Sequence, residues 1–185
     1  MDSLFLILSL VILVFVLWGT VLFALLFLFD RIRGHDLPTS KKAREAIALL
    51  MHVHGKHVRR VLDAGCGRGT HALALQRTFP SLSIRAIDRA VLRIFFARIK
   101  KFFLQSPVHF ECNDLFATDM RNADVVYVYI WWDMLPALEK KLWNELKPGA
   151  LVITNTVSFP NWTPRATYTV HPRTPEHERL FLYVR

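Results

Sequence analysis

A glycine-rich turn that follows a short apolar segment is the feature that most constrains the fold. Residues 61–70 read Val-Leu-Asp-Ala-Gly-Cys-Gly-Arg-Gly-Thr, which is typical of a buried strand, a tight turn and the start of a helix. Glycines in such a turn can take positive φ and let the backbone approach a ligand closely, while the helix N-terminus presents free amides. The segment therefore predicts a nucleotide-type binding site at the end of a strand.

The spacing of the glycines separates the site types that use such a turn. A phosphate-binding P-loop needs Gly-Lys-Ser/Thr, which is absent, and a dinucleotide fold needs GxGxxG, whereas Gly65, Gly67 and Gly69 follow GxGxG. Asp63, two residues before the first glycine, would repel a pyrophosphate. A carboxylate at this position instead suits a ligand that has a cationic amino group and no phosphate.

Strand and helix patterns alternate around this turn. Apolar runs predict strands at residues 58–63, 83–88, 108–112, 123–130 and 150–155. Helical patterns lie at about 70–78, 89–104 and 135–146, after a first helix that is capped by Thr39 or Ser40 and runs to about His54. Such alternation indicates an α/β fold with a mostly parallel sheet and helices on both faces. Residues 165–170 and 180–185 break the alternation and predict an antiparallel hairpin at the sheet edge.

The pattern Asp63-x-Gly65-x-Gly67-x-Gly69 resembles the motif of class I S-adenosylmethionine-dependent methyltransferases. The order of elements over residues 40–185 agrees with that family. The resemblance implies a Rossmann-like methyltransferase domain with S-adenosylmethionine as its cofactor. It also implies that Gly65 and Gly67 line the methionine moiety and that Asp63 lies near its amino group, directly or through water.

Two further carboxylates follow successive strands. Asp88 ends the second predicted strand, where an acidic side chain can accept both ribose hydroxyls. Residues 113–116, Asn-Asp-Leu-Phe, resemble the family's adenine-binding turn, in which Asp114 would accept from the adenine amino group with Leu115 or Phe116 against the ring. Either carboxylate alone is more often a cap or turn residue, but together they favour cofactor binding. The predicted cofactor-binding residues are Thr39, Asp63, Gly65, Cys66, Gly67, Gly69, Asp88, Arg89, Asn113, Asp114, Leu115 and Tyr129.

Motifs in the C-terminal half narrow the resemblance. Three segments carry this closer resemblance. They are Pro38-Thr39 before the first helix, then Leu135-Pro136-x-Leu138-x-x-Lys141-Leu142-x-x-Glu145-Leu146-x-x-Gly149-Ala150, and finally Phe159-Pro160-x-Trp162-x-Pro164. Together they resemble the membrane-anchored protein lysine methyltransferases that act on the ATP synthase c-subunit and the adenine nucleotide translocase. The chain departs from that pattern at Arg68, where the family has an acidic residue, and in the Tyr129-Ile130-Trp131-Trp132 end of the fourth strand. The resemblance implies a lysine acceptor on a membrane-associated protein.

The residues on the substrate side are predicted at the end of the fourth strand, where substrates enter such sheets. Trp131, Trp132 and Asp133 are the candidates, because aromatic rings there can receive an alkylammonium group. Tyr127 and Tyr129 have a competing interpretation as core residues, since they alternate with apolar neighbours. No Asn/Asp-Pro-Pro-Tyr/Phe motif is present, which disfavours a nucleic-acid methyltransferase.

An uncharged apolar run at residues 4–29 predicts one transmembrane helix, interrupted only by Ser9, Gly19 and Thr20. A cleaved signal peptide is the alternative, but the segment lacks a basic n-region and a small-residue cleavage site. Positive charge follows the run, so the N-terminus should lie outside and the rest on the cytoplasmic or matrix-equivalent side. We therefore expect an anchor at residues 1–33 and a methyltransferase domain at 34–185.

Charge and cysteine content agree with that organisation. The chain has 24 Lys and Arg against 15 Asp and Glu, a formal net charge of +9. Nucleic acid or anionic lipid headgroups would both suit this charge, and the tether favours lipid. Cys66 and Cys112 lack CxxC spacing, and the cluster His52, His54 and His57 has no carboxylate or cysteine nearby, so no metal is expected.

The predicted helix at residues 89–104 carries an apolar stripe that we assign to the core. The stripe comprises Leu92, Phe95, Phe96, Ile99, Phe102 and Phe103. The same helix carries the basic residues Arg93, Arg98, Lys100 and Lys101, for which a solvated face is the default and contact with anionic lipid the alternative.

Three functions remain open on the sequence. The favoured one is a membrane-anchored methyltransferase that modifies a lysine of a membrane-associated protein. The second is a methyltransferase of a lipid, quinone or other small amphiphile. The third is a membrane-tethered cofactor-binding protein that has lost transfer, because fold alone does not establish activity.

Overall fold

A computed structural model describes residues 2–33, 37–55, 57–174 and 178–185, and the side chains of 2 and 29–33 are outside that description. The chain forms two compact units, residues 1–37 and residues 38–185. Residues 34–36, which directly follow the predicted anchor, lie outside the described residues. The boundary predicted between anchor and domain stays a prediction.

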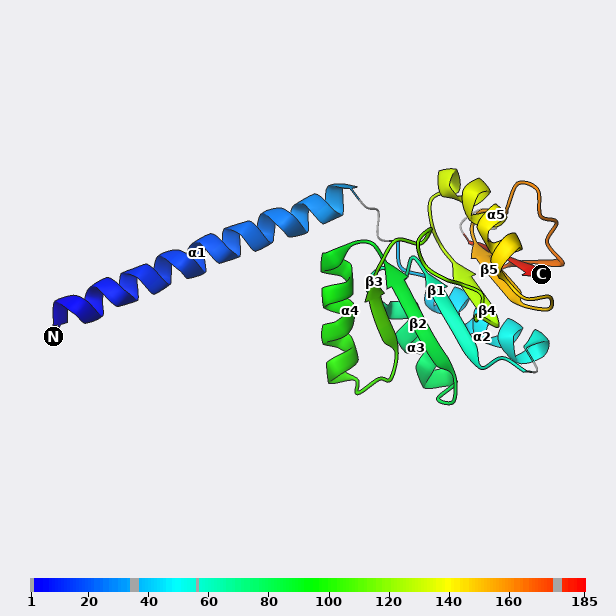
Figure 1. The fold of residues 1–185 in the computed structure, drawn as a ribbon, viewed down its shortest axis with the longest axis horizontal. Coiled ribbons are helices and arrows are strands. Elements are labelled where there is room, and N and C mark those ends of the chain that lie inside the picture. The colour runs from blue at the N-terminus through cyan, green and yellow to red at the C-terminus, as the bar shows by residue number, and fades with distance from the viewer. Residues whose placement is uncertain (1, 34–36, 56, 175–177) are drawn as a thin grey trace. The chain divides into compact units, whose positions relative to one another are not determined.

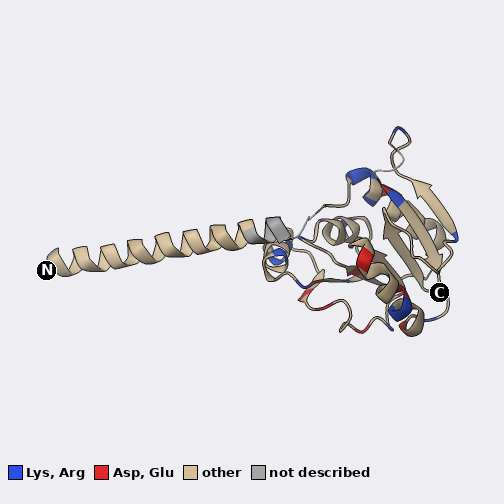
Figure 2. Ribbon diagram, turned by 90° about the horizontal axis from the view of Figure 1, so that it is seen from above, with Lys and Arg blue, Asp and Glu red and all other residues tan. Residues whose placement is uncertain are grey.

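The N-terminal unit contains the long helix α1 (Asp2–Arg33). Its segment Ser3–Leu28 is long and apolar enough to cross a membrane, with a mean hydropathy of 2.9, and Figure 2 shows no charged residue along residues 4–28. The two hydroxyl groups in the segment bond within the helix: Ser9 Oγ donates to the carbonyl of Phe5 and Thr20 Oγ1 to that of Leu17, both at 2.8 Å. Polar groups satisfied in this way are compatible with a hydrocarbon environment.

The second unit is built on a seven-stranded sheet (Figure 1). Its strands are β1 (Arg60–Ala64), β2 (Ser83–Asp88), β3 (His109–Cys112), β4 (Val125–Val128), β5 (Leu151–Asn155), β6 (Ala166–Thr169) and β7 (Arg179–Val184). The order is β3-β2-β1-β4-β5-β7-β6, with β1 to β5 parallel. Strand β7 runs antiparallel between β5 and β6, so the predicted hairpin lies at the sheet edge.

Helices cover both faces of this sheet, as the sequence predicts. The helices are α2 (Lys41–His54), α3 (Thr70–Thr78), α4 (Val91–Phe103) and α5 (Leu135–Glu145), and a short 3-10 turn, η1 (Trp132–Met134), precedes α5. Ile47 of α2, Leu73 of α3 and Ile94 of α4 belong to one apolar core. Leu138 of α5 belongs to the other, on the opposite face. Because β1 to β5 run in parallel, their carboxyl ends meet at one edge of the sheet, where the candidate site lies.

Element limits differ from the predicted ones by a few residues, for local reasons. Strand β1 begins at Arg60 rather than Val58, and the carboxylate of Asp124 accepts from the backbone N–H groups of Arg59 and Arg60 at 3.0 and 2.8 Å where the strand starts. Of the two predicted caps of α2, Ser40 is the cap, since its Oγ accepts from the N–H of Ala43.

The prediction that the apolar stripe of α4 packs in the core is wrong. Only Ile94 and Ala97 of this helix are buried. Phe95, Phe102 and Phe103 are exposed by 50, 78 and 77 %. The helical spacing of apolar residues identified an amphipathic helix correctly. Its buried face, however, is the narrow strip that contains Ile94 and Ala97.

Candidate active site

The glycine-rich turn after β1 is held tightly against the end of β2. The N–H groups of Gly65 and Cys66 both donate to the carbonyl of Ile87, at 2.9 and 2.8 Å. Gly65 has φ +83°, and a side-chain carbon there would lie 2.7 Å from Ile130 Cγ2. Gly69 has φ +72°, and a side chain would meet the Phe110 ring at 2.5 Å. Both positions therefore require glycine, for conformation and for space.

Asp63 is a buried carboxylate beside this turn. It pairs in register with Tyr127 of β4 and is 2 % exposed. Its Oδ2 has no hydrogen-bond partner among the described residues. Burial, and then the charge of Asp88, raise the pKa of Asp63 to about 7. An acceptor atom left open at such depth is costly unless a ligand completes it.

Asp88 at the end of β2 joins the turn to the next helix. Its carboxylate accepts from the N–H of Gly67 at 2.9 Å and from the N–H of Ala90 at 2.8 Å. A carboxylate has about four lone-pair positions, so two remain for a ligand. Asp88 thus both shapes the glycine turn and keeps capacity for two further donors.

The segment after β3 forms a compact turn. The Asp114 Oδ1 accepts from the N–H of Phe116 at 2.6 Å, and the Asn113 N–H donates to the carbonyl of Asp88 at 3.2 Å. Leu115 is buried in the core on the α5 face, whereas Phe116 is 39 % exposed. Of the two candidates for contact with an adenine ring, Phe116 is the more accessible.

Residues 63–166 match the profile of the ANTKMT methyltransferase domain, more than half of the chain. The chain belongs to the ANTKMT methyltransferase domain family. The recognition of the chain as a methyltransferase of this type is therefore confirmed.

Individual relatives agree with this assignment. The mouse lysine N-methyltransferase of the ATP synthase c-subunit is 30 % identical over 134 residues, 70 % of this chain and 51 % of the relative. A protein-lysine N-methyltransferase of Saccharolobus islandicus is 26 % identical, over 67 % of this chain and 78 % of the relative. The chain spans little more than half the length of several curated relatives that it matches. Other matches carry the names of an uncharacterized RNA methyltransferase of Agrobacterium fabrum and a malonyl-[acyl-carrier protein] O-methyltransferase of Priestia megaterium, so the named acceptors differ among the matches.

A solved structure confirms the predicted fold class. The RNA methyltransferase of Salinibacter ruber, solved with S-adenosyl-L-homocysteine, aligns with a TM-score of 0.71 at 23 % identity. The alignment covers 80 % of this chain and 93 % of that one. The Rossmann-like architecture with its antiparallel C-terminal strands is thus common to both.

The remaining predicted cofactor residues of this ANTKMT-type domain flank the same edge of the sheet. Thr39 is buried just before α2, and its Oγ1 lies 2.8 Å from the hydroxyl of Tyr127. Tyr129 is half-buried directly after β4. Cys66 is buried in the glycine turn, and Arg89 is exposed after β2. The role of each of these residues toward a cofactor stays a prediction.

Sequence reasoning missed a buried polar network beside the site. The Tyr127 hydroxyl accepts from Asn155 Nδ2 at 3.2 Å, and this amide also donates to Glu178 Oε1 at 3.1 Å. Glu178 in turn bonds the N–H of Ser40 and His171 Nε2. The network links β4, β5, the start of α2 and the segment before β7. No local sequence signal connects residues this far apart.

His71, the second residue of α3, is also unexpected. It is buried, its ring centroid lies 4.2 Å from that of Tyr127, and neither ring nitrogen has a hydrogen-bond partner among the described residues. Burial, and then the positive charge of Arg44, lower the pKa of His71 to about 3. The imidazole is therefore neutral at physiological pH.

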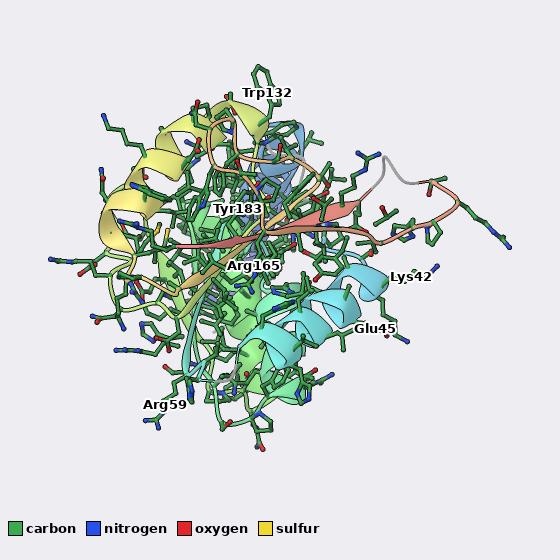
Figure 3. The ribbon with its side chains drawn as sticks, turned by 90° about the vertical axis from the view of Figure 1, so that its right-hand side faces the viewer. Lys42, Glu45, Arg59, Trp132, Arg165 and Tyr183 are labelled. Atoms are coloured by element: carbon green, nitrogen blue, oxygen red, sulfur yellow. The ribbon has the colours of Figure 1, made fainter. Side chains whose placement is uncertain are left out.

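The predicted substrate-side residues surround the turn η1. Trp132 is 69 % exposed and projects away from the ribbon in Figure 3, while Trp131 and Asp133 are also exposed. Tyr127 is buried with its hydroxyl bonded, as the competing core interpretation expected. Contact of Trp131, Trp132 and Asp133 with a substrate stays a prediction.

The C-terminal motif that carried the closer resemblance has structural contacts. The rings of Phe159 and Trp162 stack, the Tyr183 ring packs against both at a tilt, and the Tyr183 hydroxyl accepts from the N–H of Phe159 at 2.9 Å. Glu139 of α5 accepts from the backbone and side-chain amides of Asn161. These contacts fix the segment after β5 onto α5.

Groups of three or more potential metal ligands are absent from the part of the chain that the structure describes. Nε2 of His54, one of the three histidines clustered in the sequence at 52, 54 and 57, lies 3.3 Å from the hydroxyl of Tyr168.

Proposed function

We propose that this chain is an S-adenosylmethionine-dependent methyltransferase, anchored in a membrane by α1, that methylates a lysine of a protein in or beside that membrane. The observation that carries the proposal is the open carboxylate oxygen of buried Asp63 beside the glycine turn, in a domain of this family. The lysine acceptor is taken from the names of the mouse and Saccharolobus islandicus relatives.

The residues present fit S-adenosylmethionine. Asp63 would attract the α-ammonium group, and its burial makes that charge pairing strong. Asp88 retains two lone-pair positions for the ribose hydroxyls. The glycines at 65 and 67, both with positive φ, would leave the methionine side free of side chains, and Phe116 and the turn at 113–116 would receive the adenine.

The cofactor would supply a methyl group on a positively charged sulfur. The chain's own task is to align a neutral amine and exclude water. An exposed lysine near neutral pH is deprotonated only to about one part in a thousand. Burial near a positive charge lowers the pKa of an amine, so no dedicated base is required. Trp131 and Trp132 would guide the alkylammonium group by contact with their ring faces.

The charges that flank α1 support a proposal for the side of the membrane on which the domain lies. Positive residues gather after the apolar segment, at Arg31, Arg33, Lys41, Lys42 and Arg44. We infer that the catalytic domain lies on the cytoplasmic or matrix-equivalent side. Protease added to sealed native vesicles of known orientation should then cleave the domain only from that side.

The test of the proposed function is transfer to native membranes. Purified full-length protein is incubated with radiolabelled S-adenosylmethionine and membranes from its own source, beside Asp88→Ala and the matched control Asp119→Ala. Asp119 is an exposed carboxylate that pairs with Arg121. Label in a discrete protein band, retained in the control and lost in Asp88→Ala, would support the proposal.

Two other results would contradict the proposal and favour one of the alternative functions. Label that survives protease and extracts with lipid would replace the lysine acceptor by a small amphiphile. Cofactor binding without any transfer would indicate a tethered binding protein.

A further inference from the structure

We propose that the exposed face of α4 is a membrane-docking surface whose partner is an anionic lipid bilayer. We define the α4 face as Val91, Phe95, Ile99, Phe102 and Phe103. The inference rests on the proposed anchoring by α1 and adds a second contact with the same membrane.

The α4 face is apolar on the side of the helix that points away from the core. At about 100° per residue, Val91, Phe95 and Phe102 fall within about 40° of one another, with Ile99 and Phe103 beside them. Ile94 and Ala97, which are buried, lie on the other side. Val91 is 70 % exposed, and Phe102 and Phe103 are exposed still further. A large apolar strip of this kind marks an interaction site.

Charge identifies the partner. Arg98 and Lys101 border the α4 face along one side and Arg93 borders it along the other, while the helix contains no acidic residue. Lys100 does not belong to these margins, because its Nζ donates to the carbonyl of Arg68 at 3.2 Å. An apolar strip with aromatic residues and basic margins is the pattern of helices that lie in the plane of a membrane interface. Basic margins are attracted to anionic headgroups, whereas a second copy of the same basic helix would be repelled.

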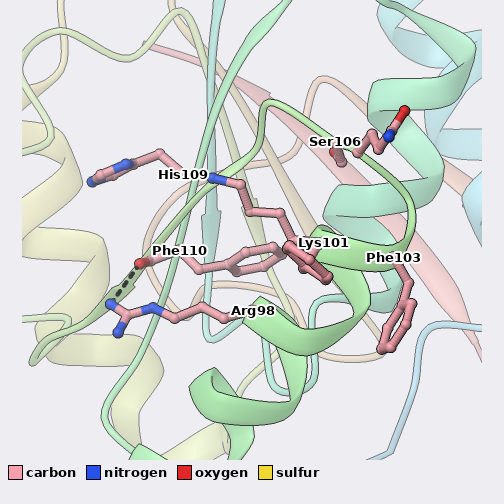
Figure 4. Close-up of a pocket in the computed structure, with 8 residues that line it drawn as sticks. Arg98, Lys101, Phe103, Ser106, His109 and Phe110 are labelled. Atoms are coloured by element: carbon pink, nitrogen blue, oxygen red, sulfur yellow. Dashed lines mark hydrogen bonds between the residues drawn. The ribbon is translucent and has the colours of Figure 1, made fainter.

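A hollow at the C-terminal end of α4 continues this surface. It has a volume of about 740 Å³ and lies between the end of α4 and β3, lined among others by Arg98, Lys101, Phe102, Phe103 and His109 (Figure 4). Arg98 Nη2 donates to the carbonyl of Phe110 at 3.0 Å, which holds the guanidinium group at the rim. Cationic and aromatic groups side by side suit the boundary between headgroups and acyl chains.

The length of chain between the two units keeps the domain near the bilayer. Seven residues separate the end of α1 at Arg33 from the start of α2 at Lys41. Even fully extended, they span on the order of 25 Å. Helix α4 begins at Val91, three residues after Asp88, so docking along α4 would hold the ligand-binding edge of the sheet close to the membrane surface. A tether of this length raises the local concentration of lipid around α4.

Site-specific fluorescence on the full-length chain tests the proposal. An environment-sensitive label is placed at Phe102→Cys or, as the matched control, at Asn144→Cys, an exposed position on α5. Both variants carry Cys112→Ser, because Cys112 is the exposed one of the two thiols. Single chains are reconstituted in nanodiscs of phosphatidylcholine, with or without phosphatidylglycerol and with or without brominated acyl chains.

We expect the label at residue 102 to shift to the blue and to be quenched by brominated chains, more strongly with phosphatidylglycerol. The label at residue 144 should show neither change. Equal behaviour of the two labels in both lipid mixtures would overturn the proposal. So would a shift at residue 102 that appears in detergent and grows with protein concentration, because it would identify a second copy as the occupant.

A second set of variants separates docking from anchoring. Phe95→Ser, Phe102→Ser and Phe103→Ser are combined and compared with Leu49→Ser, which alters an apolar residue of α2 that is 62 % exposed. The triple variant should still float with vesicles through α1 but lose the methyl transfer rate to membrane acceptors, with cofactor affinity unchanged. Wild-type protein that fails to float would contradict the anchoring instead, and a triple variant with the wild-type rate would contradict docking.

Discussion

The carboxylate of Asp88 accepts a hydrogen bond of 2.9 Å from the backbone N–H of Gly67, so the end of β2 holds the glycine turn that follows β1. The second oxygen of Asp88 binds the N–H of Ala90 at the start of α4. One side chain therefore positions two of the segments that would surround a cofactor. Removing the Asp88 side chain should therefore weaken ligand binding in two ways, by losing a ligand contact and by releasing the segments that it holds.

Replacing Asp88 by alanine removes both backbone contacts and the predicted ribose acceptor. A hydrogen bond to a charged group contributes roughly 1.5–3 kcal/mol, so we expect cofactor affinity to fall by about ten- to a hundredfold. Isothermal titration with S-adenosylmethionine measures the change, with Asp119→Ala as the control. Equal affinity in wild type and Asp88→Ala would remove Asp88 from the site.

Cofactor binding should depend on pH through Asp63. Its pKa is raised to about 7, so the carboxylate becomes protonated as the pH falls below that value and no longer attracts an ammonium group. We expect cofactor affinity to fall by roughly tenfold per pH unit below about pH 7. Asp63→Asn should bind weakly and without this dependence. An affinity of the wild type that stays constant between about pH 5.5 and 7.5 would be inconsistent with the role of Asp63.

Asp63 and His71 should have opposite effects on stability without ligand. The raised pKa of Asp63 gives stability that is complete below about pH 3.8 and is lost as the pH rises through about 7. The lowered pKa of His71 gives stability that is complete above about 6.5 and is lost as the pH falls toward about 3. Between about pH 4 and 6.5 the two trends oppose each other.

A variant that lacks one of the two groups should therefore show the pH dependence of stability that the other group causes. Asp63→Asn should become more stable as the pH rises through that window, and His71→Phe less stable, each by up to about 1.4 kcal/mol per pH unit. Denaturant titrations of the full chain in micelles at several pH values measure the slopes. If the free energy of unfolding changed with pH in the same way in both variants, Asp63 and His71 would not have opposite effects on stability.

The glycine turn provides a steric test with an internal control. Gly69→Ala places a carbon 2.5 Å from the Phe110 ring, whereas Gly149→Ala at φ +86° meets nothing within 4 Å. Both variants bear the conformational cost of positive φ, about 1–2 kcal/mol. Only Gly69→Ala should lose further stability, measured as a lower thermal midpoint. Similar losses at both positions would mean that the turn is not closely packed.

The Tyr127 hydroxyl should matter for ligand binding as well as for stability. Tyr127→Phe breaks the contacts with Thr39 and Asn155, leaving buried polar groups unpaired at about 1–3 kcal/mol. We expect a several-fold weaker cofactor affinity, because Thr39 loses its partner. Tyr183→Phe, a buried hydroxyl on the other face of the sheet, should lower stability alone. A change in cofactor affinity in Tyr183→Phe but not in Tyr127→Phe would contradict this.

The architecture was predictable because local patterns dominate it. Helix α3 and strand β2 have the predicted limits, since a glycine turn starts one and Asp88 ends the other. The carboxyl ends of parallel strands then bring Asp63, Asp88 and Asp114 to one edge of the sheet, as the strand order requires.

What could not be predicted depends on long-range packing. The contacts of Tyr127 with Thr39 and Asn155 join residues far apart in sequence, and no periodicity encodes them. Helix α4 illustrates the same limit: an apolar stripe indicates that a face is amphipathic but not which partner covers it. Small Ala97 sits against the sheet, while the larger Phe102 and Phe103 remain exposed.

The central claim is methyl transfer to a lysine of a membrane-associated protein. Its most direct test is tandem mass spectrometry of the labelled protein from native membranes, after incubation with full-length wild-type chain or with Asp88→Ala. The account predicts a methyl group on a lysine side chain of one membrane-associated protein, present with wild type and absent with the variant. Methylation confined to lipid or small molecules, to another type of residue, or unchanged in Asp88→Ala would contradict it.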